Sequence, residues 1–84
     1  MLSKEQIIKE CKEIFVKHEV LTEDEDVFVI EQKISSLDSL TNVNVLMDIE
    51  EKFNFTLPDE YLAENVLSNM QSLIGLIQEL SVEQ

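Results

Sequence analysis

An all-α fold is predicted for this sequence, a small four-helix bundle with a long first connection and a short third helix. Apolar residues recur at helical spacing in long stretches near both ends of the chain and in its middle. Helix-start signals stand ahead of these stretches, and the one run that could form a strand has no partner strand. The 84 residues, 44% of them hydrophobic, are expected to form a single domain over residues 1–84.

The first helix is predicted to follow Ser3 and to run for about four turns. Ser3 and Gln6 match a capping box, with Leu2 placed to pack against Ile7 across the first turn. The stripe expected to face the core comprises Ile7, Ile8, Cys11, Ile14, Phe15 and His18. We interpret Cys11 as a small core residue rather than a nucleophile, and His18 as a cap of the helix C-terminus rather than a metal ligand.

Residues 19–37 have no sustained period and are expected to form a long connection whose apolar side chains cover the core. The run Val27–Ile30 could form a short strand, but the connection is the preferred interpretation because no second strand is present. The acidic run Glu23–Asp26 lacks the alternating oxygen ligands and central glycine of an EF-hand loop, so we reject calcium binding. Loops of this length in small domains are often functional.

The stretch Leu37–Phe53 is predicted to form the central helix, and it has two apolar faces. The first, expected to be core, comprises Asn42, Val45, Leu46, Ile49 and Phe53. The second comprises Leu40, Val43 and Met47, bordered by Glu50 and Glu51. If the first face is buried, the second points to solvent and suits a docking partner. The alternative is that residues 19–37 cover the second face. Asp38 and Ser39, at the start, are both preferred N-caps.

Two further helices are predicted beyond the central one. A short third helix begins at Pro58-Asp59-Glu60 and includes Tyr61, Leu62 and Val66. Ser68 and Gln71 match a second capping box, and the helix that follows directs Met70, Leu73, Ile74, Ile77 and Leu80 inward. Gly75 inside it costs about 1 kcal/mol relative to alanine, which close approach of a neighbouring helix would explain. Residues 81–84 are expected to fray.

The charge balance and the residue counts favour some classes of function over others. Eighteen acidic residues against six basic ones give a net charge of −12, which repels nucleic acid and anionic lipid and favours basic patches on other proteins. The alternative is that the acidity only keeps a small protein soluble. The apolar runs are too short for a membrane span, no signal peptide precedes the first helix, and one cysteine allows no internal disulfide, so a cytoplasmic location is expected. A monomer is expected as well. One His and one Cys without a paired motif argue against an enzyme, and no metal site is expected.

From Ile34 to Glu60 the chain resembles the carrier-protein family, which comprises the acyl carrier proteins and their peptidyl and D-alanyl relatives. The residues that carry the resemblance are Asp38-Ser39-Leu40, Val43, Leu46-Met47, Ile49-Glu50-Glu51, Phe53 and Leu57-Pro58-Asp59-Glu60. The resemblance implies a 4′-phosphopantetheine arm on Ser39, beside Asp38, transferred from coenzyme A by a phosphopantetheinyl transferase. The thiol of that arm would hold an acyl or aminoacyl group as a thioester.

The same resemblance implies partner-binding roles for Leu40, Val43, Met47, Glu50 and Glu51, which would meet loading and downstream enzymes that carry basic docking patches. This chain departs from fatty-acid carriers in two ways. Ser35 and Ser36 stand where those carriers place glycine, and Thr41 and Asn44 are neutral where they tend to have acids. A carrier for a specialised pathway, such as polyketide, nonribosomal peptide or modified-lipid synthesis, is therefore preferred.

Three alternatives stay open at this stage. The first is a carrier of primary fatty-acid synthesis, and the second is a D-alanyl carrier, which Leu37 before Asp38 would suit. The third belongs to another class: a helical interaction module that carries nothing, in which Ser39 is only a cap.

Overall fold

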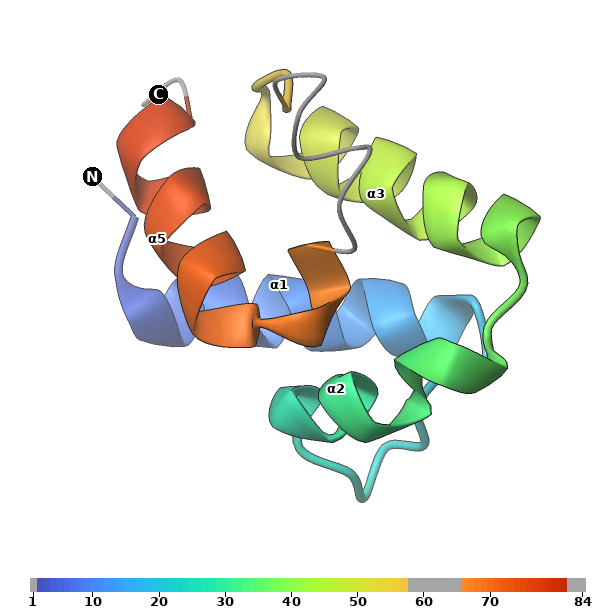
Figure 1. The fold of residues 1–84 in the computed structure, drawn as a ribbon. Coiled ribbons are helices and arrows are strands. Elements are labelled where there is room, and N and C mark those ends of the chain that lie inside the picture. Colours follow the sequence, from blue (N-terminus) through green and yellow to red (C-terminus); the bar gives the residue numbers. More distant parts are fainter. Residues whose placement is uncertain (1, 58–65, 82–84) are drawn as a thin grey trace.

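A computed structural model describes residues 2–57 and 66–81 of the chain. It is a small four-helix bundle in these ranges, built from α1 (Lys4–Lys17), α2 (Ile30–Lys33), α3 (Ser39–Phe53) and α5 (Met70–Leu80) (Figure 1). Three short 3₁₀ helices, η1 (Val27–Val29), η2 (Ile34–Ser36) and η3 (Val66–Ser68), lie between them. No strand occurs in the described ranges, so the predicted all-α class is confirmed.

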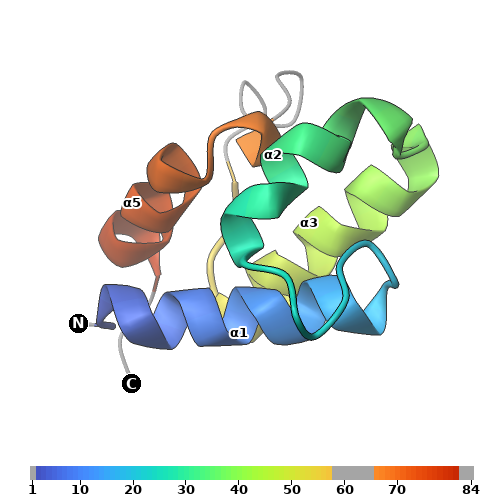
Figure 2. The same cartoon turned by 90° about the horizontal axis from the view of Figure 1, so that it is seen from below.

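Helix α1 runs along one side of the bundle, and the other helices lie across it (Figure 2). Its N-cap is Ser3, whose Oγ accepts a hydrogen bond from the Gln6 backbone N–H at 3.1 Å. The Gln6 side chain donates to Glu10. Each α-helix buries at least one large side chain completely in the shared core, represented by Phe15, Ile30, Ile49 and Leu73. The bundle therefore has one hydrophobic core, to which elements from the whole described chain contribute.

The connection after α1 covers the core, as predicted, but it does so as short helices. The run Val27–Ile30, which could have formed a strand, is helical, and its residues Val27 and Ile30 are buried. The Asp26 carboxylate caps η1 by accepting from the Phe28 N–H at 2.9 Å. Glu25 accepts from Lys33 Nζ at 2.6 Å, which joins the preceding turn to α2. Helices of three or four residues are too short to produce a recognisable hydrophobic period, and the sequence therefore looked irregular.

Helix α5 begins one residue later than the predicted capping box requires. Its N-cap is Asn69, whose Oδ1 accepts from the Ser72 N–H at 3.1 Å. Ser68 belongs to η3 instead, and Asn69 has the extended backbone that an N-cap needs, so the prediction of Ser68 as the cap is wrong. The Glu31 carboxylate of α2 also accepts from the Met70 N–H at 2.8 Å, which ties α2 to the start of α5.

Four of the five residues predicted to point inward from α5 are buried, namely Met70, Leu73, Ile74 and Ile77. Leu80 is 36% exposed at the end of the helix, so its inward placement is wrong. At the end of α5, the Ser81 N–H donates a hydrogen bond to the Ile77 carbonyl oxygen at 2.9 Å. The predicted third helix lies outside the described residues, except for Val66, which is buried in η3. The rest of the predicted frayed tail, 82–84, also lies outside them.

Gly75 is exposed, and a Cβ built there would meet no heavy atom within 4 Å. The prediction that a neighbouring helix approaches closely at this residue is therefore wrong. Gly75→Ala should raise the free energy of unfolding by about 1 kcal/mol, because alanine loses less backbone entropy in a helix and has room here. Urea titration followed by circular dichroism measures the change, and a loss of stability would mean that the site is crowded.

Candidate functional site

The candidate site begins where α3 begins. Asp38 has extended backbone angles, and its Oδ1 accepts from the Thr41 N–H at 2.7 Å, while its carbonyl oxygen accepts from the Asn42 N–H at 3.1 Å. The Thr41 hydrogen bond lowers the pKa of the Asp38 carboxyl group. Asp38 is thus the N-cap of α3, and a charged carboxylate at a helix N-terminus is favoured by the helix dipole.

Ser39 is the first residue of α3 and is exposed. Because Asp38 is the cap, the interpretation of Ser39 as the cap of this helix is wrong. The Ser39 hydroxyl makes no hydrogen bond to any other residue that the structure describes. The Ser39 hydroxyl is thus accessible at a helix N-terminus, where free N–H groups favour negative charge.

Helix α3 presents the two faces that the sequence predicted. Val45, Leu46, Ile49 and Phe53 are buried in the core. On the other side Leu40 is 70% exposed, Val43 48% and Met47 58%, and we call these three residues the outer stripe of α3. The alternative that residues 19–37 cover this stripe is therefore wrong. Three exposed apolar side chains in one row form a candidate interaction surface.

Glu50 and Glu51, predicted to border the docking face, have different surroundings. Glu51 is exposed, whereas Glu50 is partly buried and its Oε2 accepts from the Leu57 N–H at 2.6 Å. The Glu50 carbonyl oxygen also accepts from the Phe55 N–H at 3.1 Å, after Asn54 adopts a left-handed conformation with φ of 57°. Glu50 therefore holds the segment that follows α3, and its predicted role in partner binding stays a prediction.

Asn42 is the one polar residue on the face predicted to be core. Its Oδ1 is buried and has no hydrogen-bond partner in the described part of the chain. A buried acceptor left without a partner costs about 1–3 kcal/mol. The sequence signalled this residue only as a polar interruption of an apolar face, one turn after Ser39.

A polar connection between α1 and α3 was not foreseen from the sequence. Asp48 Oδ2 accepts from His18 Nε2 at 2.6 Å and from Lys17 Nζ at 3.2 Å, and these hydrogen bonds, His18 first, lower the pKa of the Asp48 carboxyl group. His18 is also the C-cap residue of α1, as predicted. About thirty residues separate the partners, so no local pattern could have revealed the contact.

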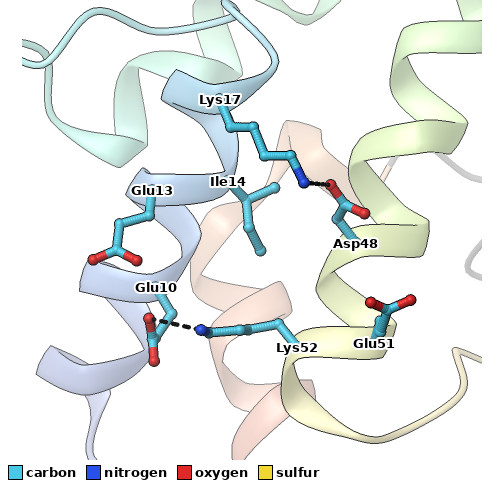
Figure 3. A pocket seen from close by; sticks show the side chains of 7 residues that line it. All are labelled: Glu10, Glu13, Ile14, Lys17, Asp48, Glu51 and Lys52. Atoms are coloured by element: carbon cyan, nitrogen blue, oxygen red, sulfur yellow. Dashed lines mark hydrogen bonds and ion pairs between the residues drawn. The ribbon is translucent and has the colours of Figure 1, made fainter.

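Beside this connection lies a surface groove of about 390 Å³ between α1 and α3, which we call the α1–α3 groove (Figure 3). Seven residues line it: Glu10, Glu13, Ile14, Lys17, Asp48, Glu51 and Lys52. Lys52 Nζ approaches Glu10 Oε1 at 3.5 Å, which forms a second ion pair across it. Glu51, from the predicted partner-binding set, is thereby brought next to residues of α1 that the sequence did not single out.

The remaining chemistry-bearing residues do not form a second site in the part that is described. Cys11 is fully buried, and burial raises the pKa of its thiol to about 12, so its interpretation as a core residue is confirmed. Residues 2–57 and 66–81 contain no cluster of His, Cys, Asp or Glu that could hold a metal ion. Every helix within these ranges falls short of the length and apolar character needed to cross a membrane.

Asp48→Asn should lower the free energy of unfolding at neutral pH by about 1 kcal/mol, because it removes an ion pair and weakens the contact with His18. The folded-state pKa of Asp48 is depressed below its ordinary value of 3.8. Its contribution is therefore complete above about pH 4 and is lost as the pH falls through the depressed value.

Urea titrations of both proteins between about pH 7 and pH 2 measure this difference. The difference in the free energy of unfolding between wild type and variant should become smaller only at the acidic end of this range. Asp24→Asn, at an exposed residue of the acidic run, is the matched control and should leave the free energy of unfolding almost unchanged. If Asp48→Asn were less stable than the wild type by the same amount down to the lowest pH, the stabilising role assigned to the ionised Asp48 carboxylate would be contradicted.

Comparisons with known proteins add no relative to this description. No family model matches the chain, and neither a curated protein nor a solved structure does. What can be concluded about function therefore depends on the sequence motif at Ser39 and on the geometry of α3.

Proposed function

We propose that this protein is a discrete carrier that holds acyl or aminoacyl groups as thioesters on a 4′-phosphopantetheine arm attached to Ser39. In this proposal the chain is not an enzyme, and a separate phosphopantetheinyl transferase attaches the arm from coenzyme A. Loading and downstream enzymes with basic docking patches are the further partners. A cytoplasmic location and a monomeric state belong to the same proposal.

One observation carries the proposal. Within Asp38-Ser39-Leu40, the aspartate caps α3 and leaves the serine hydroxyl exposed and without a partner among the described residues. A helix that needed only a cap would be complete with Asp38. The rival class, an interaction module in which Ser39 merely starts the helix, therefore has no use for this serine, although it accounts equally well for the outer stripe.

The residues of the chain have distinct tasks in this proposal. Ser39 supplies the hydroxyl oxygen that forms the phosphodiester, and the first turn of α3 favours the negative charge of that group. Asp38 holds the first turn in place through its bond to Thr41. The arm itself supplies the thiol that carries the cargo. Leu40, Val43 and Met47 offer apolar contact to the enzymes that act on it, with Glu51 at the acidic border.

We favour a specialised pathway, namely polyketide, nonribosomal peptide or modified-lipid synthesis. Thr41 and Asn44 leave the front of α3 without the acidic side chains that fatty-acid carriers tend to have, and Asn44 is exposed where a partner would meet it. Carriers of primary fatty-acid synthesis and D-alanyl carriers are the remaining alternatives within the same class.

Incubation with coenzyme A and a broad-specificity phosphopantetheinyl transferase should increase the mass of the intact protein by one phosphopantetheine group. Ser39→Ala should show no increase, because it removes the oxygen that accepts the group. Ser35→Ala, which changes a neighbouring exposed serine, is the matched control and should be modified as fully as the wild type. Intact-protein mass spectrometry measures all three.

Two results would refute the carrier proposal. One is the absence of any mass increase with several transferases, although the protein is folded. The other is an equal increase in Ser39→Ala, which would place the group elsewhere.

Met47→Glu tests the outer stripe. We expect the free energy of unfolding to change by less than about 1 kcal/mol, because Met47 is mostly exposed, while transferase-catalysed modification slows because a charge enters an apolar contact. Urea titration and the time course of the mass increase are the two measurements. Leu80→Glu, which adds the same charge on α5, is the control and should be modified at the wild-type rate. Unchanged modification of Met47→Glu would remove the stripe from the docking surface.

A further inference from the structure

Asn42 Oδ1 is the one buried side-chain polar atom without a hydrogen-bond partner in residues 2–57 and 66–81. The side chain as a whole is partly exposed, so it lies at the edge of the core rather than in its centre. An acceptor in this condition costs stability, because it has lost its contact with water and has gained no other donor. A native residue of this kind needs an explanation, and a donor supplied by a bound group is one.

The described residues around Asn42 do not supply the missing donor. Its backbone N–H is already used, since it donates to the Asp38 carbonyl oxygen at 3.1 Å. The Ser39 hydroxyl makes no hydrogen bond to a described residue and so does not reach the amide. The neighbours on the same face of α3 have apolar side chains without a donor: Val45, Leu46 and Ile49. The amide of Asn42 is therefore left unsatisfied by the way in which α3 packs.

Asn42 lies one turn after Ser39 on α3. Residues three apart in a helix have Cβ atoms about 5–6 Å apart, so the two side chains are neighbours. Ser39 lies at the boundary between the two faces of the helix, because at about 100° per residue it is about 60° from Asn42 and about 70° from the centre of the outer stripe. A group attached to Ser39 can therefore lie against Asn42 and leave the outer stripe free.

We propose that Asn42 positions the 4′-phosphopantetheine arm, by accepting a hydrogen bond from the half of the arm nearest the phosphodiester. That half offers one hydroxyl and one amide N–H group. Because Asn42 is already partly exposed, only its side chain has to rotate for Oδ1 to turn towards Ser39. The inference rests on the proposed function, since it needs the arm on Ser39. It assigns a role to a residue outside the motif that indicated a carrier.

A side-chain amide is suited to this contact in either orientation. It has two N–H donors and one carbonyl acceptor, so it can pair with the hydroxyl, the N–H or the carbonyl group of the arm. The contact would hold the start of the arm on the side of Ser39 that faces away from the outer stripe. One hydrogen bond contributes little net free energy, so an enzyme docked on the stripe can still draw the arm away from α3.

The change in melting temperature on modification tests the contact. Wild type, Asn42→Leu and Asn42→Gln are each melted before and after a transferase attaches the arm, and intact-protein mass confirms that attachment is complete. Gln71→Leu is the matched control, because it exchanges an exposed amide on α5 for the same apolar side chain. Asn42→Ala takes the place of Asn42→Leu if the leucine prevents attachment.

Attachment should raise the melting temperature of the wild type by about 4–8 °C more than that of Asn42→Leu, as expected for one hydrogen bond in a domain of this size. The phosphate charge at the first turn of α3 acts on both proteins and cancels in this difference. Asn42→Gln keeps an amide and should recover part of the effect, and Gln71→Leu should respond as the wild type does. Before attachment, Asn42→Leu should melt no lower than the wild type, because it removes an unpaired buried acceptor.

Isotope-filtered NMR on the wild type locates the contact without any variant. In ¹⁵N-labelled protein that carries an unlabelled arm, NOEs should connect the side-chain N–H₂ protons of Asn42 to the methyl protons of the arm. The N–H₂ resonances of Asn42 should move on attachment, whereas those of Asn69, the N-cap of α5, should stay in place.

Two results would overturn the inference even though the arm is attached. One is an equal change in melting temperature for wild type and Asn42→Leu, which would make Asn42 a purely structural residue. The other is a set of NOEs that joins the arm only to the outer stripe. Failure of the transferases to modify Ser39 would overturn the carrier proposal and this inference together. Modification without coupling to Asn42 would overturn this inference alone, so the two failures are distinguishable.

Discussion

The rotation of α3 about its own axis is the constraint on which the rest of the site depends. Val45, Leu46, Ile49 and Phe53 are buried together, and each contributes about 1.5–3 kcal/mol by leaving water. Any other rotation would expose some of these side chains. With the helix held in this way, Leu40, Val43 and Met47 necessarily point outward. The outer stripe is thus a consequence of how the core packs.

Carboxylates hold the helices in place as well as making the surface acidic. Glu31 bonds to the first N–H of α5, Glu50 bonds to the Leu57 N–H beyond α3, and Asp48 receives His18 and Lys17 from α1. Hydrogen bonds to charged groups are stronger than those between neutral groups. Part of the acidity behind the net charge of −12 therefore serves the fold.

The division between paired and unpaired acids is clearest in the α1–α3 groove. Glu10 and Asp48 are occupied by lysines of the opposite helix, whereas Glu13 and Glu51 are not. The sequence wheel treats Glu51 only as a border of the stripe, because it considers one helix at a time. Packing α1 beside α3 converts that border into one side of a depression.

The sequence by itself determined the features that depend on neighbours within one or two helical turns. These are the all-α class, the cap at Ser3, the burial of Cys11 and the two faces of α3, since helical period and capping chemistry are local. Tertiary structure alone decided the rest. The bond of Asp48 to His18, the bond of Glu31 to Met70 and the open space beside Gly75 depend on how distant segments pack together. Such contacts leave no periodic signal in the sequence, because their partners lie thirty or more residues apart or are absent altogether.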